Sequence, residues 1–367
     1  MKILIVYASA GTGHRRAAEA LYKELLKKKD IEVNLIDALD YTNLLFKYFY
    51  SHGYKFLIVR LPHIWGFLFY LTNNAIFNRL TTYPRTVINN LNSFRLKYFL
   101  VSLNPDVIIS THFFANGVID HLRKKHKINS RLISIITDFN AHRFWISRGV
   151  DKYIVATQRT KEDLLSKGIT DEKIEVLGIP VDPVFLGDLN RQRLAQKFSL
   201  RKDIFTVLLA TGTIGIGPLK DLVDILRNQI QILVVCGNNK KLFNELKKEE
   251  SNNLKVFGLV DNIHELMAVS DILIIKAGGL TISEALVAKL PMIFLPLVPG
   301  QEEFNARVLS VYKAGVIAGN LIKIKNLILS YKDSKKELQE FKSAIESIRK
   351  PNAINDILNL ARDYAKS

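Results

Sequence analysis

Short apolar runs alternate with amphipathic stretches along most of the chain, and this alternation constrains the fold more than any other feature. The runs are rich in Ile, Val and Leu, as expected of strands that are buried on both faces of a sheet. Strands that alternate with helices form parallel sheets, so we predict an α/β fold. The predicted strands span residues 3–7, 32–36, 107–110, 132–136, 152–156, 206–210, 231–236, 255–257, 272–275 and 292–295, and the clearest helices span 17–29, 161–166, 219–228 and 283–288.

The pattern is interrupted between Gly178 and Asp203, where prolines and charged residues stop regular structure. A chain of 367 residues is also too long for one ordinary core, and its 48% hydrophobic and 24% charged residues are values of a globular protein. We therefore predict two α/β domains, residues 1–185 and 200–350. An amphipathic helix in 351–367 is expected to pack back on the first domain.

The sequence gives no indication of export. Its one cysteine, Cys236, lies in an apolar run and has no partner for a disulfide, which fits a reducing compartment. Residues 3–10 superficially resemble a signal peptide, but the stretch is short and continues into Gly11, so a buried first strand explains it better. No segment offers about 20 uninterrupted apolar residues, so we expect no membrane-spanning helix. The predicted location is the cytoplasm.

Residues 41–105, called the acid-free segment below, contain no Asp or Glu, and fifteen aromatic residues lie between Phe46 and Phe99. The net charge of the whole chain, +17, requires an anionic partner. Aromatics and cations without acids suit a lipid headgroup layer, where each cation contributes about 1 kcal/mol. The alternatives are an aromatic subdomain packed on the core, or RNA binding, for which no motif is present.

We therefore predict peripheral binding to the inner face of the cell membrane, and no nucleic-acid partner. The residues expected to contact the membrane are Phe46, Tyr50, Lys55, Trp65, Phe67, Phe69, Arg79, Arg85 and Arg95.

The motif Gly11-Thr12-Gly13-His14 stands between the first predicted strand and a helix. Glycine allows a sharp turn and lets backbone N–H groups approach an anion at a helix start. The motif lacks the third glycine of a dinucleotide fingerprint and the lysine of a Walker loop. His14 lies at the carboxyl edge of a parallel sheet, where α/β clefts form, although a capping or surface histidine is an equal alternative. Asp138 ends another strand at the same edge and is a second catalytic candidate or a helix cap.

A second glycine motif begins at Lys276, after a predicted strand. Gly278 and Gly279, followed by Thr281, would build a helix start suited to a diphosphate. Glu284 lies one turn further on, where it would accept hydrogen bonds from both ribose hydroxyls or close a capping box with Thr281.

Two more polar loops follow strands of the second domain. Residues 299–305 offer an amide and two carboxylates at the spacing of sugar hydroxyls, and residues 211–217 form a pliable glycine loop. Neither loop is specific by itself.

Taken together, residues 276–305 resemble glycosyltransferase family 28, with Gly-Gly-Leu-Thr-x-x-Glu-Ala-Leu followed by Pro-Gly-Gln-Glu-x-x-Asn. Within that family the chain looks most like the diacylglycerol glycosyltransferases and monogalactosyldiacylglycerol synthases. The similarity runs from about residue 3 to about residue 320 and includes residues 11–18, 110–112, 137–138, 145–153, 178–183 and 256–260. Many relatives have Pro at the position of Ala277.

The resemblance implies a GT-B fold, in which two Rossmann-like, doubly wound domains face an inter-domain cleft. It also implies a UDP-sugar donor, a diacylglycerol acceptor, inversion at the anomeric carbon and no metal or other cofactor; no Asp-x-Asp pair is present. A cation or a helix dipole would then stabilise the departing UDP.

In this picture His14 is the first candidate for the base and Asp138 the second. Phe257 to Val260 would face uracil, Glu284 the ribose, and the loop from Gly278 the diphosphate. The residues expected to bind the UDP-sugar are Gly13, Gly212, Thr213, Gly237, Phe257, Gly258, Val260, Gly278, Gly279, Leu280, Thr281, Glu284, Gln301, Glu302 and Asn305.

Three other functions compete with this one. The first is the related N-acetylglucosaminyltransferase that forms lipid II, which shares the fold and the donor nucleotide. The second is a non-catalytic protein that binds membranes or senses nucleotides, and the third is a nicotinamide dehydrogenase, which the missing dinucleotide fingerprint disfavours. The sequence does not distinguish glucose from galactose as the transferred hexose.

Overall fold

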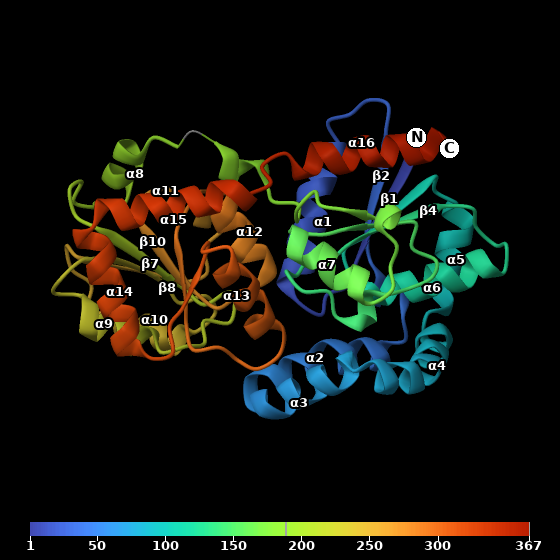
Figure 1. Ribbon diagram of the computed structural model, residues 1–367, viewed down its shortest axis with the longest axis horizontal. Helices are drawn as coiled ribbons and strands as arrows, with labels where there is room; N and C mark the ends of the chain where they lie inside the picture. The colour runs from blue at the N-terminus through green and yellow to red at the C-terminus, as the bar shows by residue number, and fades with distance from the viewer. Residues whose placement is uncertain (188, 367) are drawn as a thin grey trace. The chain divides into compact units, whose positions relative to one another are not determined.

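The computed structural model describes residues 1–187 and 189–366, and its contacts divide the chain into two compact units (Figure 1). The first unit comprises Met1–Asp182, Val298–Gln301 and Asn352–Ser367, and the second comprises Pro183–Leu297 and Glu302–Pro351. Each unit is built around its own six-stranded parallel sheet.

The sheet of the first unit has the strand order β2-β1-β3-β4-β5-β6. Its strands are β1 (Lys2–Tyr7), β2 (Glu32–Asp37), β3 (Val107–Ser110), β4 (Arg131–Ile135), β5 (Lys152–Ile154) and β6 (Ile174–Glu175). The register pairs Ile3 of β1 with Val33 on one side and Val107 on the other.

Helices cover both faces of this sheet, and two apolar cores result. One core lies under α1 (Thr12–Leu25) and α16 (Ala353–Lys366), and Ile357 of α16 is fully buried in it. The other core lies under α6 (Phe113–Lys124) and α5 (Phe94–Leu103). The remaining elements of the unit are η1 (Ala38–Tyr41), α2 (Leu44–Arg60), α3 (Pro62–Asn73), α4 (Ala75–Asn92), η2 (Arg143–Trp145), α7 (Gln158–Ser166) and η3 (Asp171–Lys173).

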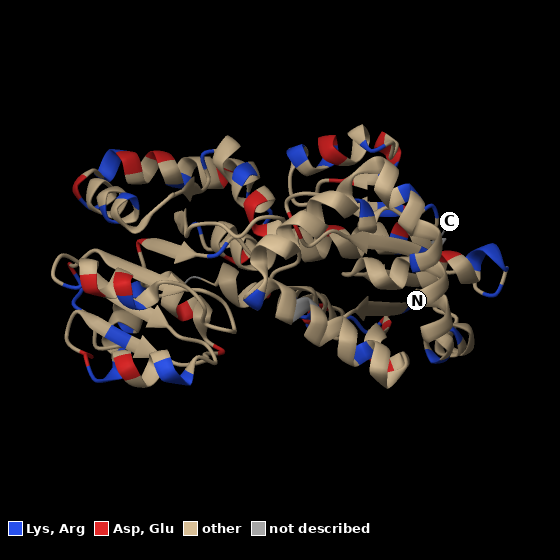
Figure 2. Cartoon of the chain, turned by 90° about the horizontal axis from the view of Figure 1, so that it is seen from below, with Lys and Arg blue, Asp and Glu red and all other residues tan. Residues whose placement is uncertain are grey.

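The sheet of the second unit has the strand order β12-β11-β10-β7-β8-β9. Its strands are β7 (Thr206–Ala210), β8 (Gln231–Val235), β9 (Leu254–Phe257), β10 (Ile272–Ile275), β11 (Met292–Phe294) and β12 (Val316–Ile317). Its helices are η4 (Pro183–Leu186), α8 (Arg191–Lys197), α9 (Leu219–Leu226), α10 (Lys240–Lys247), α11 (Ile263–Ala268), α12 (Gly279–Val287), α13 (Gln301–Val311), α14 (Leu321–Asp333) and α15 (Lys335–Ile348). Figure 2 shows that basic and acidic residues are mixed along the outer helices of this unit.

All ten predicted strands are confirmed, with ends that differ by at most two residues. The sequence did not indicate β6 and β12, because each is only two residues long and leaves no apolar run. Three helices begin earlier than predicted: α1 at Thr12 rather than residue 17, α7 at Gln158 rather than residue 161, and α12 at Gly279 rather than residue 283. In α1 and α12 the reason is a glycine N-cap, because glycine is also typical of loops.

Each sheet has one point at which the order of its strands reverses. In the first unit this point lies between β1 and β3, and in the second between β7 and β10. Ligands of open α/β sheets bind outside the carboxyl ends of the strands at such a point. The loops that follow these four strands are therefore the first places to look for a site.

Candidate active site

His14 lies in the first turn of α1, directly after the turn that leaves β1. Its Nδ1 atom is 3.0 Å from the carbonyl oxygen of Thr111, which follows β3, and 2.7 Å from Oγ1 of Thr137, which follows β4. Burial lowers the pKa of His14, while Asp138 and the Thr111 hydrogen bond raise it. A ring that is neutral in the resting state is able to accept a proton.

A second histidine lies against His14 at the same reversal point. His112 is the N-cap of α6, its Nδ1 accepts a hydrogen bond from the Phe114 N–H at 3.2 Å, and its ring is perpendicular to that of His14 at 4.6 Å between centroids. Burial and the neighbouring His14 lower the pKa of His112 well below its usual value. The sequence analysis predicted no role for His112, Thr111 or Thr137. Thr111 and His112 follow β3 at the reversal point, and Thr137 follows the neighbouring strand β4.

Asp138 is buried and lies beside the amide of Gln301. The Gln301 Nε2 atom donates to Asp138 Oδ1 at 2.5 Å, and the segment Val298–Gln301 that carries this amide is counted with the first unit. The first unit thus brings together His14, Asp138 and Gln301, which the sequence analysis had placed in three different motifs.

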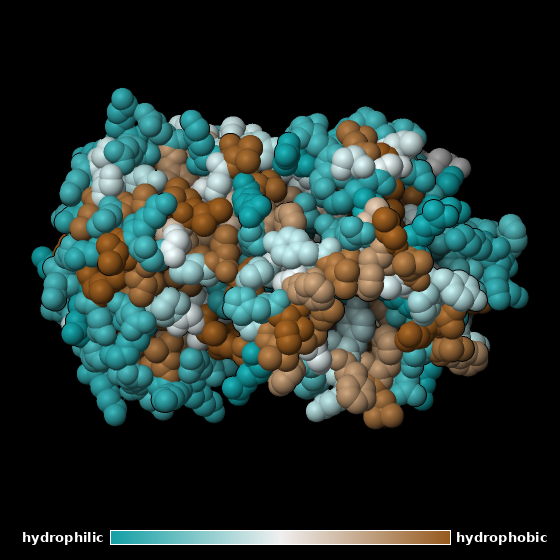
Figure 3. Space-filling model, turned by 60° about the horizontal axis from the view of Figure 1, so that its bottom comes forward, coloured by the Kyte–Doolittle hydropathy of each residue, from teal (hydrophilic) through white to brown (hydrophobic). Residues whose placement is uncertain are grey.

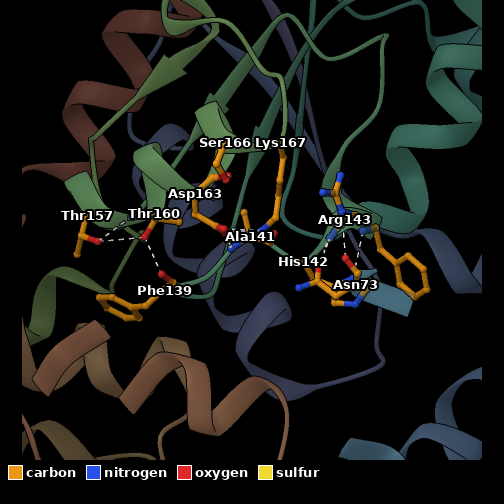
Figure 4. Close-up of polar contacts among 11 residues, drawn as sticks. Asn73, Phe139, Ala141, His142, Arg143, Thr157, Thr160, Asp163, Ser166 and Lys167 are labelled. Atoms are coloured by element: carbon orange, nitrogen blue, oxygen red, sulfur yellow. Dashed lines mark hydrogen bonds and ion pairs between the residues drawn. The ribbon is translucent and has the colours of Figure 1, made fainter. Parts of the chain in front are cut away.

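The loop after Asp138 is held on two sides (Figure 4). On the α7 side, Thr160 Oγ1 donates to the Phe139 carbonyl at 2.8 Å, and the Ala141 N–H donates to Asp163 Oδ2 at 2.9 Å. On the other side, the Arg143 N–H donates to Oδ1 of Asn73, the last residue of α3, at 3.0 Å. Contacts of this kind fix the backbone from which Asp138 projects.

In the second unit, the glycine motif after β10 begins helix α12. Gly278 is the N-cap, and no side chain caps the first turn, so a capping box between Thr281 and Glu284 is absent. A Cβ atom added at Gly278 would meet nothing within 4 Å, which leaves room for a ligand atom close to the backbone. Glu284 is buried within the same helix. The N-terminus of a helix with this geometry favours an anion.

The amide of Asn305 connects α13 to the glycine motif, because its Nδ2 donates to the Ala277 carbonyl at 3.0 Å. Burial raises the pKa of Glu302, and the nearby cation Lys276 lowers it. The sequence analysis predicted no role for Lys276. Its position directly after β10, a strand at the reversal point, was the indication that the sequence offered.

The remaining predicted donor residues lie after neighbouring strands of the same sheet. Gly212 and Thr213 follow β7 and pack on Gly237, which follows β8: a Cβ added at Gly237 would lie 2.6 Å from the Thr213 carbonyl oxygen. Phe257 ends β9, and Gly258 and Val260 come after it. Gly13 belongs to α1 of the first unit.

The acid-free segment forms helices α2 to α5, and it carries most of the large apolar side chains that are exposed in the described residues. Figure 3 shows apolar side chains gathered over the side of the first unit where these helices lie. The most exposed are Leu44, Leu45, Phe49, Phe67, Ile76, Leu80, Tyr83, Leu91, Phe94 and Tyr98.

Not every predicted membrane residue belongs to this surface. Phe46 and Tyr50 pack against the first unit's core, and the Arg85 guanidinium lies 4.0 Å over the Phe144 ring. Composition alone does not tell which face of a helix its aromatics occupy. Phe67, Arg79 and Arg95 are exposed, Trp65 and Phe69 are half-buried, and the side chain of Lys55 lies outside the described part of the chain.

Two kinds of feature were not found in the described residues. None of their helices is long and apolar enough to cross a membrane. Nor do these residues contain a group of three or more His, Cys, Asp or Glu side chains placed to hold a metal ion.

Both halves of the chain match known families. Residues 14–181 match the family model of monogalactosyldiacylglycerol (MGDG) synthase, and residues 188–357 match the glycosyltransferase family 28 C-terminal domain. A processive diacylglycerol beta-glucosyltransferase of Bacillus mycoides (strain KBAB4) is 32% identical over 384 residues, covering 100% of this chain and 95% of the relative. The chain belongs to the diacylglycerol glycosyltransferases of family 28. A relative with the same name from Bacillus pumilus (strain SAFR-032) is 29% identical, with coverages of 97% and 93%.

Solved structures show that the family 28 chain has the GT-B fold. Acinetobacter baumannii MurG superposes with a TM-score of 0.62 at 16% identity, over 99% of both chains. The S. aureus MnaA–UDP complex superposes with a TM-score of 0.65 at 14% identity, over 100% of this chain and 97% of that one. At such identities the likeness concerns the fold alone.

Proposed function

We propose that this chain transfers a hexose from a UDP-sugar to the hydroxyl of diacylglycerol, with inversion at the anomeric carbon and without a metal ion. The observation that carries the proposal is the match to diacylglycerol beta-glucosyltransferases over the whole chain. Because those relatives are named as glucosyltransferases, UDP-glucose is the first donor to test.

The second unit is proposed to hold the donor. The uncapped first turn of α12 would receive the diphosphate, and the Glu284 carboxylate would accept hydrogen bonds from the ribose. Lys276 would offset the negative charge that develops on the departing UDP, which is the role a divalent ion has in other transferases.

The first unit is proposed to activate the acceptor. The neutral ring of His14 would take the proton of the diacylglycerol hydroxyl while the oxygen attacks the anomeric carbon and the bond to UDP breaks. Asp138, whose charge raises the pKa of His14, would stabilise the imidazolium that forms. We propose Asp138 as the charge partner rather than the base, because it already accepts a hydrogen bond from Gln301.

The apolar surface of α2 to α5 is proposed to hold the enzyme on the inner face of the cell membrane, where its acceptor would reside. Exposed apolar side chains such as Phe67 and Leu80 would insert below the lipid headgroups, and the cations Arg79 and Arg95 would be attracted to anionic headgroups. The absence of acids from this segment removes the repulsion that an anionic surface would cause.

The test is an assay of the full chain with vesicles that contain diacylglycerol and an anionic lipid. UDP-glucose, UDP-galactose and UDP-N-acetylglucosamine are supplied separately, with and without EDTA, and lipid products are identified by mass spectrometry. We expect hexosyl-diacylglycerol in the presence of EDTA. No glycolipid with either hexose donor, or a product only from UDP-N-acetylglucosamine and a polyprenyl-linked acceptor, would contradict the proposal.

A further inference from the structure

The contacts of the His14 ring favour a hydrogen on Nδ1. The Thr111 carbonyl oxygen lies 3.0 Å from Nδ1, and a carbonyl oxygen can only accept a hydrogen bond. A hydrogen on Nδ1 satisfies this carbonyl, and the Thr137 hydroxyl oxygen, 2.7 Å from the same nitrogen, then accepts a share of it. In a neutral ring this leaves the lone pair on Nε2.

The two threonines hold His14 in different ways. Thr111, which is fully buried, also donates its hydroxyl to the backbone carbonyl of His14 at 3.0 Å, so it fixes the helix start as well as the ring. Thr137 bonds to the ring through a hydroxyl that approaches from the next strand of the sheet, and among the described residues it makes no hydrogen bond to the backbone of α1. A substitution at Thr137 therefore tests the ring without disturbing the backbone of α1.

We propose that Thr137 is a positioning residue for the transfer: with the Thr111 carbonyl, its hydroxyl oxygen keeps the hydrogen on Nδ1 and presents Nε2 to the acceptor hydroxyl. This inference rests on the proposed function, in which His14 is the base. When Nε2 takes the proton, the ring becomes an imidazolium and its Nδ1–H bonds become charge-assisted and stronger. Thr137 would thus stabilise the reacting state more than the resting one, which affects kcat rather than binding.

The titratable groups that face His14 come from two other strand ends. Asp138, after β4, raises the pKa of His14, but burial opposes it as the larger cause. His112, after β3, is neutral because burial lowers its own pKa. On α1 itself, the exposed cation Arg15 pairs with Glu19 at 2.7 Å. Thr137 adds an uncharged acceptor to this environment.

The experiment compares Thr137→Val, which removes the hydroxyl at nearly constant volume, with Thr137→Ser, which keeps it. For the valine variant we expect kcat to fall about tenfold, because one hydrogen bond to a charged group is lost. The KM for the UDP-sugar should be unchanged. The acid limb of its pH–rate profile should move to lower pH, because an imidazolium that has lost an acceptor gives up its proton more readily. Serine should restore both, and Thr42→Val, a buried hydroxyl bonded to the Leu39 carbonyl, is the matched control.

Wild-type kcat and pH profile in Thr137→Val would overturn the inference, as would a serine variant as defective as the valine one, since the methyl group would then be what matters. Nitrogen-15 spectra of the histidine-labelled enzyme supply a readout apart from activity: His14 protonated on Nε2 in the resting enzyme would contradict the assignment. His14→Ala is measured in parallel. If that variant keeps wild-type kcat, the proposed base itself is wrong; if it is inactive while Thr137→Val is normal, only the role of Thr137 fails.

Discussion

The two units begin a helix in the same way and then use it differently. In each, a strand at the reversal point leads through glycine into a helix whose first turn has no side-chain cap: Gly11 precedes α1 and Gly278 precedes α12. In the first unit a histidine occupies that turn and is held by neighbouring strand ends. In the second unit the space beside the glycine is open and a buried glutamate follows. In the proposed function, similar helix starts would serve the acceptor chemistry in the first unit and nucleotide binding in the second.

The units also differ in how the chain leaves the second strand of each sheet. After β8 a single helix, α10, leads to the next strand, and β9 pairs with β8. After β2 the chain passes through α2 to α5 before it returns on the other side of β1 as β3. The second unit has the strand order of a nucleotide-binding domain, 3-2-1-4-5-6 when its strands are counted from β7. In the first unit β2 is the edge strand, and helices α2 to α5 follow it in the chain where the second unit has a third strand.

The largest effect is expected from His14→Ala. Loss of a general base lowers kcat by about 10²- to 10⁴-fold, while UDP affinity should stay unchanged because the nucleotide is assigned to the second unit. Steady-state kinetics and calorimetric titration with UDP measure the two quantities. His126→Asn, an exposed histidine whose positive φ asparagine tolerates, is the control. A parallel loss of UDP affinity would contradict the assignment of the base to the first unit and of the nucleotide to the second.

The next effect concerns stability. Ile357 of α16 is fully buried in the core of the first unit, so Ile357→Ala should lower the free energy of unfolding by about 2–5 kcal/mol. Hydrogen exchange should show the loss in β1 and β3 and not in β7 and β10. Ile322→Ala, at a side chain that is 70% exposed, should change stability by less than about 0.5 kcal/mol. Equal destabilisation of both sheets would show that the units do not unfold separately.

Membrane binding should depend on the first unit. The double variant Arg79→Glu with Arg95→Glu removes two cations worth about 1 kcal/mol each, which is about 30-fold in partitioning to anionic vesicles before added repulsion. Vesicle sedimentation at increasing salt measures it. Lys240→Glu with Lys241→Glu makes the same change of charge on the second unit and should have a smaller effect. Equal losses from both pairs would mean that net charge, rather than this surface, drives binding.

The smallest effect is expected from Glu284→Ala. Loss of hydrogen bonds between a carboxylate and the ribose should raise KM for the donor about 10-fold with little change in kcat. Glu340→Ala, on the exposed side of α15, is the control in the same unit. A normal donor KM in Glu284→Ala would remove this residue from the ribose site.

Apolar periodicity predicted both sheets because every strand longer than two residues leaves a buried run in the sequence. The glycine motifs predicted where His14 and Glu284 lie, because strand ends at a reversal point meet in space. The partners of His14 were not predictable in this way. Thr111 and Thr137 lie 97 and 123 residues away along the chain, and only the order of the strands brings them together. Composition likewise marked the acid-free segment without showing that Phe46 and Tyr50 pack inward.

The most direct test is a crystal structure of the enzyme with bound UDP, because both α1 and α12 begin without a side-chain cap and both starts suit an anion. We expect phosphate oxygens at the backbone N–H groups of Gly279 to Thr281 and ribose hydroxyls on the Glu284 carboxylate. A diphosphate bound instead at Gly11 to His14, with the first turn of α12 unoccupied, would contradict it.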